Sequence, residues 1–241
     1  MLHLGGTNIT TDTAGEGTIN VNNNQTLTGN IGEIANFKVT GVRNFNINTA
    51  NFATSVVANA ANQVTVNVGG AASGIKNLGT RAAPLVAANF TVSAEVNNVY
   101  AADTNVAAGV TQKFKGTVSG TRLALADGTS RAFFGDESTV DAVIRGTVAG
   151  AGDVEFEGST TVLKDIGING NGVNVVRFSN NDQSTANLGT DNIFGGSTEL
   201  RKGVIKLDKN IILNTDTTVA STPLILGDKK LTVIPTKTLC S

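Results

Sequence analysis

Gly152 to Gly167 reads GDVEFEGSTTVLKDIG, and Gly17 to Gly32 reads GTINVNNNQTLTGNIG. Aligned without a gap, both stretches open on Gly, place two apolar residues two positions apart, cross a polar turn and close on Ile-Gly. The apolar pairs are Ile19 with Val21 and Val154 with Phe156. The pattern describes a short strand, a tight polar corner, a second short strand and a glycine turn. This is how one coil of a β-solenoid is encoded, so the chain is predicted to be all-β.

Alternation of apolar and polar residues extends this prediction along most of the chain. Val64, Val66 and Val68 are separated by Thr65 and Asn67, so one side of that strand is expected to be buried and the other wet. The pairs Phe37 with Val39 and Phe45 with Ile47 repeat the pattern. With about 20 to 25 residues per turn and a strand spacing of about 4.8 Å, residues 1–241 are expected to form one elongated unit of about ten turns, roughly 50 Å long.

Two stretches are less regular, and a third is regular but more apolar. Gly69 to Val110 contains Pro84, several Ala-Ala pairs and the only tyrosine, Tyr100. It fits either a loop excursion from the solenoid, where binding would be expected, or a few turns with small core residues. Residues 50–61 are alanine-rich, which favours a short helix, whereas β-branched Thr54, Val56 and Val57 favour a strand. The stretch from Gly172 to Val233 ends in its most apolar part, which predicts the best-packed turns.

Composition narrows the class of protein. Charged residues make up 15% of the chain against about 25% in an average soluble domain, and 28 Gly with many Asn and Thr fill the difference. The formal net charge of −1 and the lack of a Lys/Arg block argue against nucleic acid as a partner. The amino terminus lacks the charged and apolar regions of a signal peptide, and no apolar run approaches the roughly 18 residues of a membrane helix.

Two acidic clusters are the candidates for chemistry. Asp153, Glu155 and Glu157 alternate with apolar residues and are expected to share one strand face, while Asp136, Glu137 and Asp141 follow Phe133-Phe134. Paired carboxylates could bind a cation or act as the acid and base of a glycosidase. A solvated outer strand face and a surface loop predict the same patterns without chemistry. The chain has no Trp and one Tyr, which weighs against a polysaccharide-cleaving groove.

The remaining candidates are weaker. His3 is the only histidine and lies near the amino terminus, and Cys240 is a terminal thiol without a second cysteine. Gly150-Ala-Gly152-Asp153 occurs once, unlike a tandem calcium repeat, and predicts a turn. No catalytic residue, cofactor or metal ligand is therefore predicted. The carboxyl-terminal third has a basic bias, which would suit an anionic partner or simply keep strand edges soluble. The basic residues are Arg201, Lys202, Lys206, Lys209, Lys229, Lys230 and Lys237.

Three phrases resemble one family. GTINVNNNQTLTGNIG, GTVAGAGDVEFEGSTTVLKDIG and STELRKGVIKLDKNIILNTDTTV, with the Asn/Thr/Gly-rich spacing between them, are similar to passenger segments of rickettsial surface-antigen autotransporters of the outer membrane protein A and B type. The resemblance is strongest from Gly116 to Val233. It implies a right-handed parallel β-helix displayed at the cell surface by a carboxyl-terminal β-barrel translocator, and an association with host-cell adhesion. The chain departs from the full pattern in having neither the signal peptide nor the barrel.

The sequence therefore leads to three hypotheses. The first is a surface-exposed, non-enzymatic autotransporter passenger segment that acts as an adhesin or structural surface protein and binds a host cell-surface protein or glycan. The second is a carbohydrate-active β-helix, a glycan lyase or hydrolase, using the acidic clusters. The third is a phage or virus fibre, which would be trimeric.

Overall fold

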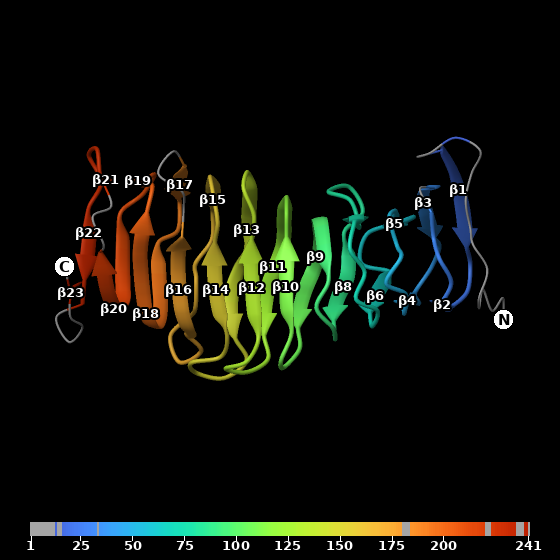
Figure 1. Ribbon diagram of the computed structural model, residues 1–241, viewed down its shortest axis with the longest axis horizontal. Helices are drawn as coiled ribbons and strands as arrows, with labels where there is room; N and C mark the ends of the chain where they lie inside the picture. Colours follow the sequence, from blue (N-terminus) through green and yellow to red (C-terminus); the bar gives the residue numbers. More distant parts are fainter. Residues whose placement is uncertain are drawn as a thin grey trace.

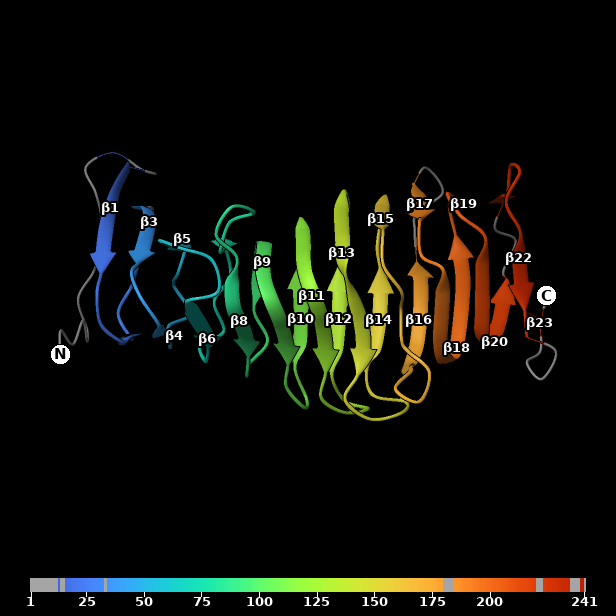
Figure 2. The same ribbon diagram turned by 180° about the vertical axis from the view of Figure 1, so that it is seen from behind.

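The computed structural model describes residues 13, 16–32, 34–179, 184–219, 223–234 and 239–240. All regular structure in these residues is strand, and the strands stack into a rod with β1 (Glu16–Val21) at one end and β22 (Leu231–Val233) near the other (Figures 1 and 2). Every pairing between named strands is parallel, and the stack makes about 10 turns. The predicted all-β, parallel β-helix fold is confirmed.

The strands stack in three columns, two of which begin at the first turns and the third at β9 (Glu95–Val106). The first column runs through β1, the whole of several short strands and the adjoining parts of three longer ones. Its members are β3 (Ile34–Val39), β5 (Ser55–Ala58), β7 (Ile75–Leu78), part of β9, the starts of β11 (Thr117–Leu125) and β13 (Ser138–Gly146), β15 (Thr160–Val162), β17 (Thr185–Leu188), β19 (Val204–Leu207) and β21 (Leu224–Ile225).

The second column includes β2 (Gln25–Leu27), β4 (Arg43–Ile47), β6 (Val64–Val68), β8 (Leu85–Phe90), the ends of β9, β11 and β13, the starts of β18 (Asn192–Lys202) and β20 (Ile211–Val219), and β22. The third includes the start of β9, β10 (Thr111–Phe114), β12 (Arg131–Phe134), β14 (Asp153–Phe156), β16 (Val173–Ser179), the ends of β18 and β20, and β23 (Leu239–Cys240).

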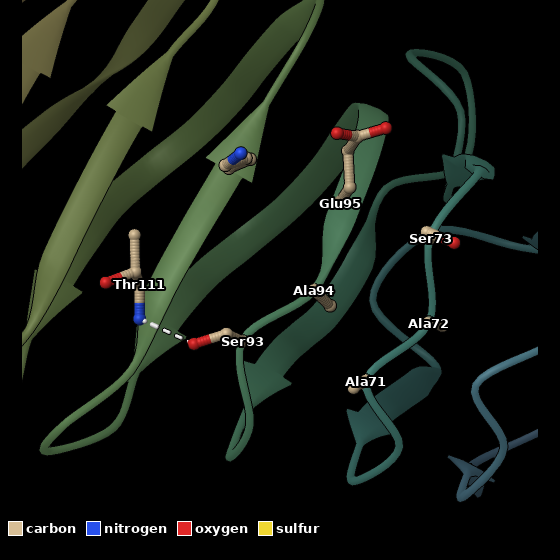
Figure 3. Close-up of a pocket in the computed structure, with 8 residues that line it drawn as sticks. Ala71, Ala72, Ser73, Ser93, Ala94, Glu95 and Thr111 are labelled. Atoms are coloured by element: carbon tan, nitrogen blue, oxygen red, sulfur yellow. Dashed lines mark hydrogen bonds between the residues drawn. The ribbon is translucent and has the colours of Figure 1, made fainter.

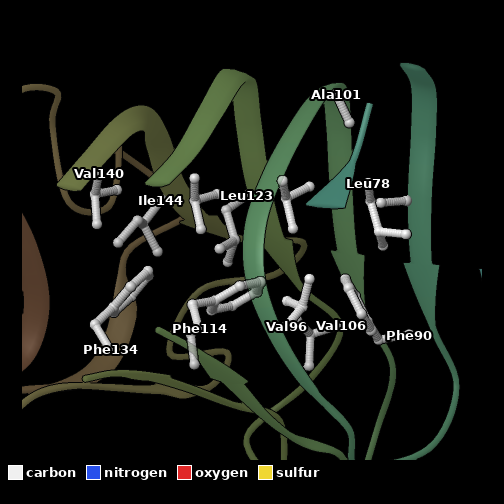
Figure 4. Packing of buried hydrophobic residues seen from close by; sticks show 14 of the residues in the cluster. Leu78, Phe90, Val96, Ala101, Val106, Phe114, Leu123, Phe134, Val140 and Ile144 are labelled. Atoms are coloured by element: carbon white, nitrogen blue, oxygen red, sulfur yellow. The ribbon is translucent and has the colours of Figure 1, made fainter. Parts of the chain in front are cut away.

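The core is a set of inward-facing ladders, one or two per column. In the third column the rings of Phe114, Phe134, Phe156 and Phe178 stack with centroids 5.0 to 5.3 Å apart, close to the spacing of the strands that carry them. Opposite this stack the other two columns are mainly aliphatic, as Val140 and Ile144 are opposite Phe134 (Figure 4). The earlier turns also bury Phe37, Phe45 and Phe90 in those columns. Successive turns therefore bury the same kind of residue at the same place.

The two copies of the repeated phrase do not occupy equivalent columns. β1, from the first copy, belongs to the first column, whereas β14, from the second copy, belongs to the third. The later strand of the second copy, β15, is the one that shares the column of β1. A strand in either column needs two inward-facing apolar residues followed by a polar corner. The phrase therefore fits at more than one position around the turn.

Residues 69–110 are turns of the solenoid, which makes the loop-excursion interpretation wrong. β7, β8 and β9 lie in this segment and pair with their neighbours on both sides. Small buried residues such as Ala72, Ala88 and Ala101 occupy core positions, as the alternative interpretation expected. The strand signal was weak because alanine and asparagine, which are poor strand formers, fill the strands here.

Two further expectations about packing are resolved. Residues 50–61 contain the strand β5 and no helix, with Phe52 and Val56 fully buried. The prediction that the apolar end of Gly172 to Val233 is best packed is wrong, because Ile225 is 50% and Leu226 36% exposed. The turns that carry the phenylalanine stack are better buried because a neighbouring turn covers them on each side.

Candidate functional site

The first acidic cluster lies on the outer side of the third column and is interlocked with arginines. Asp153 is only 8% exposed although it faces outward. Its Oδ1 accepts a hydrogen bond from Asn174 Nδ2 at 2.8 Å, its Oδ2 lies 3.1 Å from Arg177 Nη1, and Arg131 Nη2 lies at 4.0 Å. Glu155 lies beside Arg177 in the register of β14 and β16. Glu157 follows the end of β14 and is exposed.

The ion pairs continue onto the next turn. Arg177 Nε lies 3.4 Å from Glu199 Oε2, and Arg201 Nη2 lies 2.6 Å from the same oxygen. Burial opposes the charged form of Arg177, but the hydrogen bond and charge of Asp153, together with the charges of Glu199 and Glu155, outweigh it and raise the pKa of the guanidinium. We call this chain of charges, from Arg131 through Asp153, Arg177 and Glu199 to Arg201, the ion ladder. Its carboxylates are already engaged by protein groups.

The second acidic cluster lies at the corner before β13 and on β13 itself. Asp136 Oδ1 accepts a hydrogen bond from the backbone N–H of Ser159 on the next turn at 2.6 Å. Glu137 takes a left-handed backbone conformation with φ of 60°. Asp141 lies on β13, with Oδ1 3.8 Å from Lys164 Nζ. Asp136 and Asp141 are therefore engaged by different neighbouring groups, a backbone N–H and a lysine.

Of the six basic residues of the carboxyl-terminal third that the structure describes, four are paired with acids: Arg201, Lys206, Lys209 and Lys229. Lys206 lies 3.4 Å from Asp208, Lys209 lies 3.4 Å from Asp191, and Lys229 lies 2.7 Å from Asp228. The Lys229 contact lowers the pKa of Asp228. Lys237 lies outside the described residues. Lys206, Lys209 and Lys229 therefore form local ion pairs with acids at corners and strands.

The other residues that the sequence analysis considered are a glycine turn, Cys240 and His3. Gly150 and Gly152 both have positive φ, 72° and 75°, and turn the chain into β14 as predicted. Cys240 lies in β23, which pairs with β20, and His3 lies outside the described residues. Within the part of the chain that the structure describes, no group of three or more His, Cys, Asp or Glu residues could hold a metal ion. That same part has no helix long and apolar enough to span a membrane.

Three hollows in the surface lie around the least regular part of the sequence. One of about 260 Å³ lies on the third column between the start of β9 and β10 (Figure 3). Short side chains, such as Ala71 and Ser73, leave this space open, and Glu95 and Lys113 stand at its edge. The N–H of Thr111 donates to Ser93 Oγ at 3.0 Å across the hollow's floor, tying adjacent turns together. Glu95 also forms an ion pair with Lys115.

Two more hollows lie at other positions around the same turns. One of about 310 Å³, at the corner between the first and second columns, is lined by residues that include Arg81, Tyr100 and Gly120. Another of about 180 Å³ lies at the corner after the second column, beside Asn89, Asn105 and Thr147. The sequence patterns did not single out these lining residues as a site. The Ala-Ala pairs of Gly69 to Val110 were the available signal, because runs of short side chains leave hollows on a regular scaffold.

The fold defines this chain as a β-solenoid protein. No protein-family model, curated protein or solved structure matches it.

Proposed function

We propose that the chain is a non-enzymatic adhesive and structural segment, a rigid rod that presents binding surfaces to host cells as the autotransporter passengers it resembles are expected to do. The observation that carries the proposal is the ring of three hollows around β7 to β11. They lie on a scaffold whose neighbouring turns are held by continuous backbone ladders. Recognition residues are commonly placed in this way, on recesses positioned by a rigid framework.

The engagement of the carboxylates supports the non-enzymatic part of this proposal. A general acid or base must reach substrate with a proton-accepting or proton-donating oxygen. Asp153 is held by Asn174 and Arg177, and Asp136 caps a backbone N–H. These contacts serve the stacking of turns, which suits a structural or display role for the rod. The competing hypothesis of a carbohydrate-active enzyme predicts release of reducing ends from a glycan panel, and loss of that release in Asp153→Asn.

The test is attachment of the purified chain to cultured animal cells, with the hollows filled one at a time. Ala71 and Ser73 are exposed and line the third-column hollow, so Ala71→Gln with Ser73→Gln fills it without touching the core. Ala149→Gln, an exposed alanine at a corner outside the three hollows, is the matched control. We expect saturable attachment of the parent chain and the control.

The two outcomes separate the hypotheses. If filling any of the three hollows weakens attachment at least fivefold while Ala149→Gln does not, the ring of hollows is the binding region. If the folded parent chain does not attach, the adhesive proposal is wrong. Release of reducing ends that Asp153→Asn abolishes would replace it with the enzymatic one.

A further inference from the structure

The hollow at the corner between the first and second columns combines groups that the other hollows lack. It contains the only tyrosine of the chain, Tyr100, and an exposed arginine, Arg81. Ser119, Thr121 and Asn62 add two hydroxyls and an amide. The hollow, of about 310 Å³, is therefore lined by an aromatic face, a guanidinium and several small polar groups. This combination suits a sugar ring that bears a negative charge.

Arg81 is available to a ligand. It makes no ion pair with any described residue, whereas the nearby acids are already neutralised by other cations. Asp103, three residues beyond Tyr100, makes a two-point ion pair with Arg122, at 2.8 and 3.0 Å. Asp141, which stacks on Ser119 in the strand register, pairs with Lys164. Arg81 is therefore the uncompensated charge of this corner, and a carboxylate is the planar anion that a guanidinium binds with two parallel hydrogen bonds.

Arg81 is carried by a turn whose backbone is held in place before any ligand arrives. It lies in the tight turn between β7 and β8, which projects beside β8 in Figure 2. The turn is closed by two hydrogen bonds, from Thr80 N–H to the Ala83 carbonyl oxygen at 3.2 Å and from Ala83 N–H to Thr80 Oγ1 at 3.0 Å. The N–H of Asn62 donates to the Pro84 carbonyl oxygen at 2.8 Å and ties the turn to the neighbouring coil. A preorganised turn lowers the entropic cost of binding.

A glycine lines the hollow where two turns approach closely. A Cβ on Gly120 would lie 1.7 Å from the carbonyl oxygen of Ala101, so no other residue fits without moving the backbone. Ser119 and Thr121, on either side, make no side-chain hydrogen bond to another described residue and can serve the hydroxyl groups of a sugar.

We propose that this hollow binds an acidic monosaccharide unit, a pyranose whose carboxylate pairs with Arg81 and whose apolar face stacks on Tyr100. The inference deepens the adhesive function proposed above, since it names a glycan as the ligand, and it rests on that function for its biological meaning. Its test does not depend on cells.

The experiment is a solution titration of the whole chain with two sugars that differ only in the charged group. D-glucuronate and D-glucose are added in parallel, and binding is followed by NMR shifts of the Tyr100 ring and the Gly120 amide. We expect millimolar binding of glucuronate, at least tenfold tighter than glucose. Arg81→Gln should remove the preference. Tyr100→Leu should weaken both sugars at least fivefold, and Tyr100→Phe should retain most of the affinity because the ring is kept.

Lys38→Gln is the matched control, because it removes the same charge from an exposed position on β3, away from the hollow. Equal affinity for the two sugars, a preference that persists in Arg81→Gln, or no binding by a chain with an unchanged NMR spectrum would each overturn the proposal. Cell attachment without glucuronate binding would retain the adhesive function and reject this site. Glucuronate binding without attachment would do the reverse.

Discussion

The amino-terminal and carboxyl-terminal halves of the rod stabilise their outer faces in different ways. In the first half, the second column carries a row of amides in which Asn67 donates to Asn46, Asn89 to Asn67 and Asn105 to Asn89, each at 2.8 Å. We call this row the amide ladder. In the second half, the third column carries the ion ladder. Both rows link one turn to the next through outward-facing side chains.

The difference follows from the chemistry of the groups. An amide has a donor and an acceptor, so identical residues can stack indefinitely. A carboxylate only accepts and a guanidinium only donates, so the ion ladder must alternate its signs. The amide ladder therefore appears in the sequence as one residue type repeated at the length of a turn, while the ion ladder appears as unrelated charges. A regular solenoid can therefore link its turns by either kind of outward-facing row.

The largest loss of stability is expected when one ring is removed from the phenylalanine stack in the carboxyl-terminal half. Phe156→Ala removes a fully buried ring that stacks on two neighbours, at 5.0 Å on each side. The cost should be about 3–5 kcal/mol of local unfolding free energy. Hydrogen exchange of peptides from β12 to β18 measures it, because a stack of turns need not unfold as one unit. Protection in β2 to β6 should remain unchanged, and a uniform loss along the rod would contradict turn-by-turn stability.

Next in size is the removal of the central charge of the ion ladder. Arg177→Leu takes away the principal partner of Asp153, a carboxylate only 8% exposed, and leaves Glu199 with Arg201. We expect a loss of about 1–3 kcal/mol, most of it from the unpaired acid. Asp153→Asn in the same chain should recover part of the loss, and thermal unfolding of the single and double variants compares them. A double variant no more stable than Arg177→Leu would show that the pairing carries little energy.

The matching change in the amide ladder should lower the free energy of unfolding by a smaller amount. Asn67→Asp keeps the acceptor for Asn89 but places a carboxylate oxygen against Asn46 Oδ1, so one hydrogen bond becomes a repulsion. The expected loss is about 1 kcal/mol at neutral pH, since these groups are only half-buried. Asn67→Thr is the control for shape and strand propensity. Amide exchange in β4, β6 and β8 gives the measurement, and an Asn67→Asp variant as stable as the parent chain would mean that the ladder adapts.

Salt distinguishes the two ladders by a smaller effect. Raising NaCl from about 0.1 to 1 M shortens the screening length from about 10 to 3 Å, which weakens partly exposed ion pairs and leaves amide hydrogen bonds nearly untouched. Exchange protection around β14, β16 and β18 should fall by a few tenths of a kcal/mol relative to β4, β6 and β8. Sodium sulfate is unsuitable as the salt because it strengthens apolar burial everywhere. An equal response in both halves would argue against a charge-based difference.

The smallest effect concerns acidic and amide caps at corners. Asp127 accepts hydrogen bonds from the side chain of Thr129 at 2.7 Å and from its N–H at 2.9 Å, which lower the pKa of this exposed carboxyl below its usual 3.8. The stabilisation is therefore present above about pH 4 and is lost as the pH falls through the lower folded-state pKa. The Thr129 amide resonance should shift in that window. The corner capped by Asn24 on Asn44 N–H should not titrate, and a shift there would contradict the assignment.

The sequence was sufficient for the fold class because apolar and polar residues alternate along each strand, as at Val64, Val66 and Val68, which are buried. Gly and Asn also mark the corners between strands. The sequence left open whether Gly69 to Val110 is a loop or continues the solenoid with small core residues, since alanine in a core strand carries little signal by itself. The ion ladder could not be predicted either. Arg131, Asp153 and Arg177 lie a full turn apart, and only the register of β12, β14 and β16 brings them together.

The Tyr100 hollow shows the same limit. Arg81, Tyr100 and Gly120 are separated by about one turn each along the chain, and their convergence depends on the lengths of two intervening corners. The offset between stacked residues is 16 for Asn89 and Asn105 but 26 for Ser159 and Thr185, so no fixed period predicts which side chains meet. Sites of this kind follow from register, which single-sequence patterns leave open.

The displacement of the repeated phrase by one column has a consequence for how such a chain can change over generations. Because the phrase fits at more than one position around the rod, a duplication or deletion that shifts the chain by a third of a coil still places apolar residues inside and polar residues outside. The gene can therefore lengthen or shorten in steps smaller than a whole coil. Surface recesses would be shuffled by the same events while the interior is preserved, so new recognition surfaces can arise without a new fold.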